Sequence, residues 1–327
     1  MGQMNKSKIF GDKRRKRSSD SFRLPRWLRT APIGVLVIVM ALLLVLATFY
    51  GASRSGDQPD PRPTETPSQI YETEPTANPN MVPAPDQPEI QKVVDKLEAE
   101  GLEVGVAVTS IAITENRLQG TWTAGSLRSG AALATADIPV ALAVLVDPKQ
   151  PEDRAYLFDK SLTQGSPAGD DALWAFLGTH DQAVSKTLRV LHSYGDWGTS
   201  IPSEEDAVSQ PYKQILWPLE NQAEFMAHVQ CDWVHTVPVM ARLDEPTTKP
   251  IGLQIAPRSF AKSGDETTAE SFKLRQTGLI DLPDGTPVAV SIMIDNPTGD
   301  KEATKISLTQ LARAVYEHAS GFARPSC

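Results

Sequence analysis

The sequence predicts an α/β fold of the α+β type: a five-stranded antiparallel sheet flanked by terminal helices, with an inserted all-helical lobe, preceded by one transmembrane helix. Three observations lead to this prediction. Residues 31–50 contain no charged residue. Within residues 88–327, apolar residues recur at helical spacing at both ends and in the middle, with strand-like stretches between them. The dipeptide Asp284-Gly285, between two of these stretches, is a strong hairpin-turn signal.

The first 50 residues have the pattern of a membrane anchor. Residues 1–30 contain ten Lys and Arg residues and two acids, Asp12 and Asp20, so their net charge is +8. The whole chain has a net charge of −8, and residues 31–327 therefore carry −16. About 20 apolar residues in a helix cross a bilayer, and flanking positive charges stay in the cytoplasm. We therefore expect a cytoplasmic head (1–30) and a single-pass plasma-membrane helix (31–50). The alternative, a cleaved signal peptide, fits poorly because a 30-residue basic segment is long for one.

The remainder of the chain should lie outside the cytoplasm, in two parts. Nine prolines fall between Pro59 and Pro88 among polar residues, so residues 51–87 are predicted to be a disordered linker. Residues 88–327 are long enough for a sizeable domain. Nucleic acid is not an expected partner, because membrane orientation and anionic lipid already explain the basic head.

The domain of residues 88–327 should begin and end with a helix. Pro88 suits a first helical turn, and the helix that follows should present one shared face of Ile90, Val93, Val94 and Leu97. A helical lobe is expected at about 130–250. After the first helix, the predicted elements in chain order are strands Glu103–Ala112 and Leu118–Thr123, helices Asp137–Val146, Glu152–Leu162, Asp170–Leu177, Asp181–Ser193 and Pro218–Val229, strands Leu253–Ala261, Phe272–Leu282 and Val288–Ile294, and helix Ser307–Ser320.

This order of elements, with several local stretches, resembles the serine β-lactamase and penicillin-binding transpeptidase superfamily over residues 88–325. The stretches resemble most a divergent actinobacterial envelope branch of class A β-lactamase-like proteins. They are Asp137–Leu145, Ala172–Gly178, Val190–Asp196, Trp217–Cys231, Ile251–Ile255 and Leu274–Gly278. The resemblance implies a cleft between sheet and lobe, where a Ser nucleophile and a Lys one helical turn later form an S-x-x-K motif.

The residues at the implied acylation site do not fit that chemistry. With the helix anchored on Pro139, the resemblance places the nucleophile at Ala134 and the lysine at Asp137. Alanine has no nucleophilic atom, and aspartate carries the wrong charge for the role of the lysine. Residues 126–139, the segment around Pro139, contain no S-x-x-K sequence; Thr135 offers a hydroxyl, but Ile138 follows three residues later.

Two further cleft elements are implied by the resemblance. Lys262-Ser263-Gly264 matches the Lys-Ser/Thr-Gly tripeptide of an edge strand, whose lysine attracts the substrate carboxylate in active relatives. Glu205 lies near the position of the glutamate that activates the deacylating water. The tripeptide and Glu205 can also be interpreted without a role in a cleft. A Lys-Ser-Gly sequence is common at strand ends, and Glu205 has two acidic neighbours, which is typical of a solvated loop. These four residues are the ligand-cleft candidates.

Histidine and cysteine usage points to no metal and no cofactor. The five histidines lack metal-ligand spacing, and no cysteine joins them. Cys231 and Cys327 would both lie outside the cytoplasm, where oxidation is allowed. The sequence leaves open whether they pair, because it does not set the distance between them.

These observations predict a membrane-anchored, extracytoplasmic, β-lactamase-like pseudoenzyme. Loss of the nucleophile removes many orders of magnitude in rate from such chemistry. The protein would be a non-catalytic binding or scaffolding module of the cell envelope, with peptidoglycan or a cell-wall peptide as its partner. Two alternatives stay open: an active serine β-lactamase or D,D-peptidase with a displaced nucleophile, and a purely structural envelope protein in which Lys262 faces solvent or a salt bridge.

Overall fold

The computed structural model describes residues 82–327 except 112, 115–116, 204–210 and 244–248. The predicted head, the predicted transmembrane helix and most of the predicted linker lie outside the described residues. In the described part of the chain, no helix combines the length and apolarity needed to cross a bilayer.

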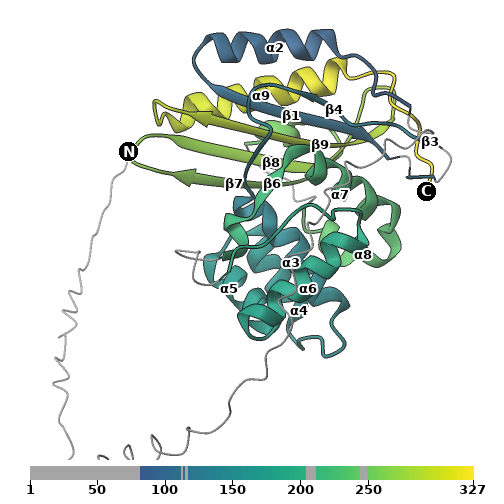
Figure 1. Cartoon of the computed structure of the whole chain (residues 1–327), viewed down its shortest axis with the longest axis vertical. Helices are drawn as coiled ribbons and strands as arrows, with labels where there is room; N and C mark the ends of the chain where they lie inside the picture. Colours follow the sequence, from purple (N-terminus) through teal and green to yellow (C-terminus); the bar gives the residue numbers. More distant parts are fainter. Residues whose placement is uncertain (1–81, 112, 115–116, 204–210, 244–248) are drawn as a thin grey trace, which may run out of the picture. The chain divides into compact units, whose positions relative to one another are not determined.

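A five-stranded antiparallel sheet forms the centre of the domain, as predicted (Figure 1). Its strand order is β4-β1-β9-β8-β7. The strands are β1 (Glu103–Ser110), β4 (Trp122–Ala124), β7 (Ser259–Thr267), β8 (Phe272–Asp281) and β9 (Pro287–Asn296). The Asp284-Gly285 turn joins β8 to β9, and Gly285 has a φ of +80°, which only glycine adopts without strain.

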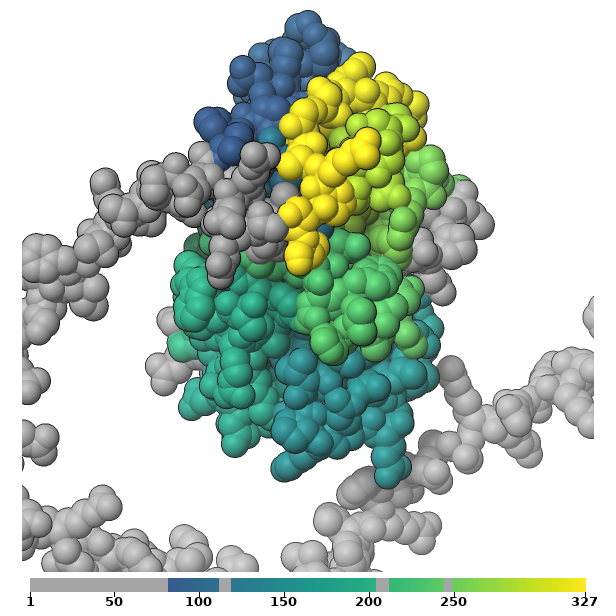
Figure 2. Space-filling view, turned by 90° about the vertical axis from the view of Figure 1, so that its right-hand side faces the viewer, coloured from purple at the N-terminus to yellow at the C-terminus, as the bar shows by residue number. Residues whose placement is uncertain are grey.

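The terminal helices α2 (Pro88–Ala99) and α9 (Lys301–His318) cover one face of this sheet. Figure 2 shows them side by side, in blue and yellow. Alternate residues of a strand point to the same side, so this face collects the branched apolar residues of β1 and β9. Val104, Val106 and Ile292 are buried there against Ile90 and Leu308. Full burial of each such side chain contributes roughly 1.5–3 kcal/mol.

The helical lobe covers the other face of the sheet, below it in Figure 1. Its central helix α3 is nearly all apolar and lies entirely inside from Asp137 to Val144. The lobe elements are η2 (Leu133–Ala136), α3 (Asp137–Val146), α4 (Arg154–Phe158), η3 (Asp159–Thr163), α5 (Pro167–Phe176), α6 (His180–Ser193), η4 (Pro211–Gln214), α7 (Leu219–Cys231) and α8 (Trp233–Met240). Two short pairs of strands complete the fold: β2 (Ile113–Thr114) with β3 (Arg117–Leu118), and β5 (Ser129–Ala131) with β6 (Leu216–Pro218).

Several predicted elements are wrong in type or bounds. The predicted strand Leu253–Ala261 is the 3₁₀ helix η5 (Gly252–Ile255) followed by β7, which begins only at Ser259. Gly252 has a φ of +56°, and the backbone N–H of Leu253 donates to the Gln276 side chain instead of to a neighbouring strand. This tertiary contact is not visible in the apolar pattern of the segment.

Other corrections concern element ends. The predicted helix Glu152–Leu162 is the short α4 followed by the π-helical turn η3. The last helix begins at Lys301 rather than Ser307, because the Asp300 side chain caps it by accepting from the N–H of Ala303. Helix α8 was not predicted, since Pro238 lies inside it and proline normally interrupts a helix.

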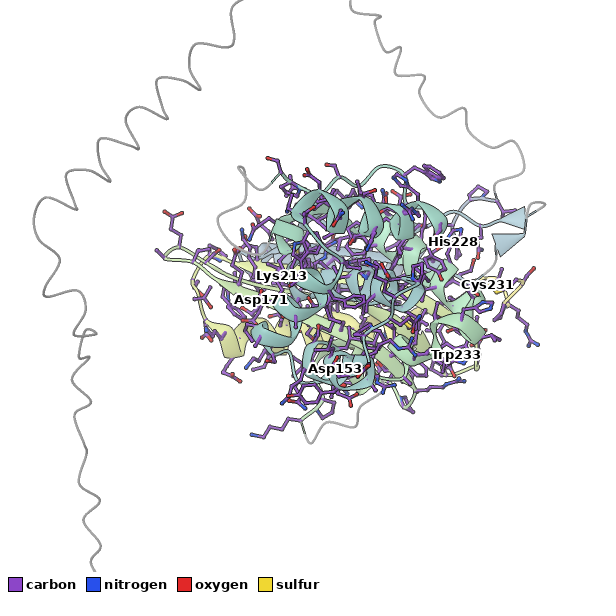
Figure 3. The ribbon with its side chains drawn as sticks, turned by 90° about the horizontal axis from the view of Figure 1, so that it is seen from below. Asp153, Asp171, Lys213, His228, Cys231 and Trp233 are labelled. Atoms are coloured by element: carbon purple, nitrogen blue, oxygen red, sulfur yellow. A yellow bond between two sulfur atoms is a disulfide. The ribbon has the colours of Figure 1, made fainter. Side chains whose placement is uncertain are left out.

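Cys231 and Cys327 form a disulfide, with their Cα atoms 5.4 Å apart. It joins the last residue of α7 to the last residue of the chain (Figure 3). The C-terminal tail is therefore tied to the helical lobe, although the helix before it packs on the far face of the sheet. The backbone N–H of Ser326 adds a hydrogen bond to the carbonyl of Ile111.

Candidate functional site

The predicted acylation positions lie where η2 runs into α3, against the edge strand β7. Ala134 is in η2, and Asp137 is the first residue of α3. Leu133 just before them has a φ of +54°, a conformation that is costly for a residue with a side chain. A methyl group added at Gly264 would lie 2.5 Å from the Ala134 backbone nitrogen. Strand and helix are thus in direct contact at this point, and there is no room for a side chain between them.

Lys262 points into this contact and away from solvent. Its residue exposure is 4%. The ammonium donates to the carbonyls of Ser161, at 2.6 Å, and Leu162, at 3.0 Å, and lies 3.3 Å from Asp137 Oδ2. The ammonium thus makes two hydrogen bonds to carbonyls and one ion pair, all within the protein. Lys262, predicted as a ligand-cleft residue, therefore lies buried in the described structure, with its ammonium bonded inside the protein.

Asp137 belongs to a wider group of buried charges. Burial raises the pKa of its carboxyl to about 7, while the nearby Lys262 opposes this rise and Asp170 adds to it. Asp170, at the start of α5, is itself buried and lies 2.6 Å from the Lys213 ammonium of η4. The Tyr212 ring is also buried, and burial next to these carboxylates raises the pKa of its hydroxyl. Two lysines and two aspartates thus balance each other inside the lobe.

A second buried group lies on the adjacent strand β8. The Arg275 guanidinium is fully buried and donates to the carbonyls of Gly130, at 2.7 Å, and Trp217, at 2.7 Å. It also donates to the Gln222 side chain at 2.9 Å, and Gln222 in turn donates to the Thr135 hydroxyl at 2.8 Å. Burial lowers the pKa of Arg275 to about 9, so it remains charged at neutral pH. These contacts join strand β8 of the sheet to the chain segment that leads into the lobe.

The hydroxyl groups of Thr135 and Ser263, which follow Ala134 and Lys262 in the chain, are both engaged within the protein. Thr135 donates its hydroxyl to the Ala132 carbonyl and accepts from Gln222. Ser263 accepts from the Gln276 side-chain amide at 2.9 Å. A nucleophile needs a base within hydrogen-bond reach of its own proton, and neither hydroxyl has a carboxylate or lysine as such a partner. The contacts of Thr135 and Ser263 therefore help to hold the lobe on the sheet.

Two further expectations concern the rest of the site. Glu205 lies outside the described residues. Among the residues that the structure describes, no group of three or more His, Cys, Asp or Glu side chains could hold a metal ion.

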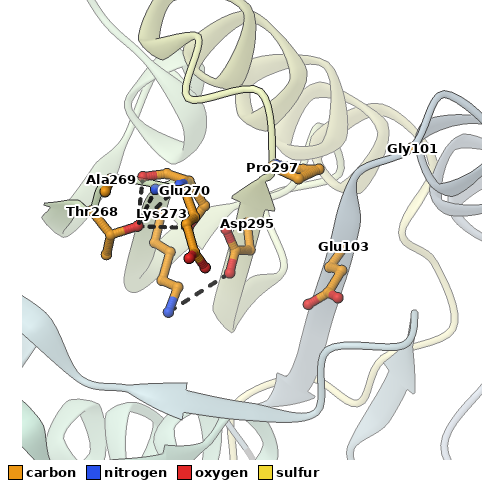
Figure 4. Close-up of a pocket in the computed structure, with 9 residues that line it drawn as sticks. Gly101, Glu103, Thr268, Ala269, Glu270, Lys273, Asp295 and Pro297 are labelled. Carbon is orange, nitrogen blue, oxygen red and sulfur yellow. Dashed lines mark hydrogen bonds and ion pairs between the residues drawn. The ribbon is translucent and has the colours of Figure 1, made fainter.

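One cavity of the described domain lies away from these residues. It has a volume of about 640 Å³ and is at the open end of the sheet, where a row of charges crosses the strands (Figure 4). Its lining includes Glu103, Glu270, Lys273 and Asp295. The Lys273 ammonium lies 3.7 Å from Asp295 Oδ2. None of the predicted site residues lines this cavity.

Sequence reasoning missed Arg275, Gln222 and Lys213. A usable signal existed for Arg275, because it stands among apolar residues in a predicted central strand, where a charge is rarely buried without partners. From the sequence, Asp170 is expected only as the first residue of the predicted helix Asp170–Leu177. It does lie in the first turn of α5, and it also pairs with Lys213, which no sequence pattern indicated.

Comparison with solved structures identifies the architecture. The chain superposes on the TLA-3 extended-spectrum β-lactamase with a TM-score of 0.56 at 15% identity, over 71% of this chain and 98% of that one. The fold is that of the class A β-lactamases. A β-lactamase from Chitinophaga pinensis gives 0.56 at 18% identity, over 70% and 98%. A class A representative from Bacteroides cellulosilyticus gives 0.56 at 14%, over 70% and 96%.

The similarity of the β-lactamase-like domain to these enzymes is one of fold alone. No family model and no curated protein matches the chain in sequence. The expected β-lactamase-like fold is thus confirmed, while the expected actinobacterial branch and membrane anchoring stay predictions.

Proposed function

We propose that this chain is a membrane-tethered, non-catalytic, β-lactamase-like module of the cell envelope, with a scaffolding or binding role. The observation that carries the proposal is the buried Lys262–Asp137 pair beside Ala134. The residue at the nucleophile position has no reactive atom. The cation that should meet substrate is instead bonded inside the lobe. The place of the catalytic apparatus is filled by contacts that hold the two layers together.

The proposal is tested by acylation. The full chain, solubilised in detergent, is incubated with a fluorescent penicillin, and hydrolysis of a chromogenic cephalosporin is followed in parallel. We expect no covalent label and a hydrolysis rate equal to that of buffer. Matched variants are Thr135→Val and Ser263→Ala, which remove the hydroxyl groups that follow Ala134 and Lys262 in the chain. Covalent labelling of the wild type that one of them abolishes would establish an active serine hydrolase and overturn the proposal.

Membrane tethering is the second part of the proposal. It is supported by the uncharged residues 31–50 and the +8 charge of the residues before them. Protease added to intact spheroplasts should digest residues 88–327 and leave the head protected. Protection of the domain as well would contradict the proposed topology.

Peptidoglycan or a cell-wall peptide is the partner that we propose for the domain. Because Lys262 is buried, such a partner would have to contact a different surface from the one predicted. Co-sedimentation of the full chain with insoluble peptidoglycan tests this. Binding that saturates supports the binding role, whereas recovery of all protein in the supernatant favours a purely structural one.

A further inference from the structure

A pocket of about 290 Å³ lies between the C-terminal end of α3 and the helix α6. The two helices pack against each other in the lobe (Figure 1). Most of the lining is apolar and comes from Ala143, Val146, Pro148, Val190 and the Tyr194 ring. Sites for small molecules are typically concave and mostly apolar, with volumes from about 300 Å³, so this pocket fits a ligand at the small end of that range.

The walls of the pocket are fixed by contacts outside it. The Tyr194 hydroxyl donates to Asp232 Oδ2 at 2.8 Å, and the Tyr194 ring packs edge-on against Phe225 with centroids 5.7 Å apart. On the opposite side, Asp147 accepts from the Lys186 ammonium at 2.6 Å. This hydrogen bond lowers the pKa of the Asp147 carboxyl, so it stays charged. Because these side chains are already held, a ligand would not have to order them on binding.

The rim of the pocket is positively charged. Arg189 lines it, is exposed, and makes no hydrogen bond or ion pair with any residue that the structure describes. Lys186 is 34% exposed, and the exposed Lys149 follows shortly after the lining residue Pro148. Asp147 is the single acid among the described lining residues, and its carboxylate is already used by Lys186. The lining residues therefore carry a net charge of +1, in a chain whose residues 31–327 carry −16.

We infer that this pocket binds a small aliphatic carboxylate, with the carboxylate on Arg189 and the aliphatic group against Val146, Pro148 and Val190. The planar guanidinium matches a carboxylate with two parallel hydrogen bonds. The apolar lining can pack against a short branched aliphatic chain. It has few polar groups that could bind a ligand with a larger polar group. The site is distinct from the buried pair at Lys262, so the inference does not depend on the proposed function.

The test uses isovalerate and its uncharged analogue isovaleramide, which have nearly the same shape. Both are titrated into the full chain in detergent and followed by saturation-transfer NMR. For a ligand of seven heavy atoms, a dissociation constant of about 1 mM is expected for isovalerate. Because isovaleramide lacks the negative charge, its dissociation constant should be about fivefold higher than that of isovalerate, or more. Absence of saturable isovalerate binding, or equal binding of the two compounds, would overturn the inference.

Two variants locate the site. Arg189→Gln removes an exposed side chain and should weaken isovalerate binding about fivefold, while isovaleramide binding stays the same. Val146→Asp places a negative charge on the rim at a residue that is 62% exposed, and should reduce isovalerate binding further. Arg313→Gln is the matched control, since it removes the same charge from an exposed position on α9. If Arg189→Gln and Arg313→Gln have the same effect, the carboxylate does not bind in this pocket.

Discussion

The two faces of the sheet bury their residues in different ways. The face under α2 and α9 is apolar, with residues such as Val106 and Ile292. The face toward the lobe carries Lys262, Thr277 and Ser291 in one row across three neighbouring strands, all buried. An apolar face needs only contact area, whereas each buried polar group needs a specific partner. The lobe face should therefore be far more sensitive to single substitutions than the face under the terminal helices.

The largest expected effect comes from removing the Lys262 ammonium. Lys262→Met leaves the Asp137 carboxyl and two carbonyls without their buried donor. Breaking a buried ion pair by removing one partner costs about 3–5 kcal/mol. We expect the free energy of unfolding to fall by that amount in urea titrations followed by tryptophan fluorescence.

Two controls sharpen this comparison. The double variant Lys262→Met/Asp137→Leu should recover most of the loss, because it removes both charges. Ile292→Val on the apolar face should cost only about 1 kcal/mol. A loss for Lys262→Met that is no greater than that for Ile292→Val would mean that the ammonium is solvated and the cleft open.

The disulfide ties the C-terminal tail, which follows α9, to helix α7 of the lobe. Its removal should cause the next largest loss of stability. Cys231 and Cys327 are 96 residues apart in sequence. Cross-links that close loops of this size stabilise by typically 2–4 kcal/mol, chiefly by restricting the unfolded chain. The double variant Cys231→Ser/Cys327→Ser should lose this amount in the same urea titration. Reductant should produce the same shift in the wild type; a wild type that it leaves unchanged would contradict a structural disulfide.

Gly264 tests whether β7 and η2 are in contact. The methyl group of Gly264→Ala would lie 2.5 Å from a backbone atom, which cannot move aside easily. Overpacking of this kind costs about 1–3 kcal/mol. Gly198→Ala is the matched control, because its methyl group would meet only the Asn221 side-chain amide at 3.2 Å. Equal stabilities of the two variants would show that the cleft beside Ala134 has room for a side chain.

The last expected effect is a dependence of stability on pH, which belongs to the lobe face. Burial raises the pKa of Asp137 from 3.8 to about 7. Between these values the folded chain holds a proton that the unfolded chain has released, so this stabilisation is complete below pH about 4 and is lost as the pH rises to about 7. The slope for one proton is about 1.4 kcal/mol per pH unit.

Asp137→Asn is the reference for this measurement, since its side chain does not titrate. Chemical denaturation of both proteins at several pH values gives the difference in their unfolding free energies. The wild type should lose stability relative to Asp137→Asn as the pH rises through this window. A difference that is independent of pH would mean that the carboxyl is charged throughout.

Much of the fold followed from local sequence patterns. Helix α3 was predicted with the bounds that it has, because its apolar run is long and uninterrupted. Strands β8 and β9 were found from their own apolar residues and the Asp284-Gly285 turn between them. The start of β7 was misplaced, because Leu253 is buried as part of a 3₁₀ helix and its apolar character does not distinguish the two conformations.

The sequence by itself led to the prediction that the nucleophile position falls on Ala134 and the lysine position on Asp137, because the residues of the motif are counted along one helix. It also predicted the antiparallel sheet with helices at both ends, since these depend on short-range periodicity. Two features were decided only by the tertiary structure. The Lys262 side chain points inward to Asp137, and the backbone of Gly264 packs against the backbone of Ala134. The physical reason is that such contacts join residues far apart in the chain. Their direction depends on how β7 packs on the lobe, which local spacing does not specify.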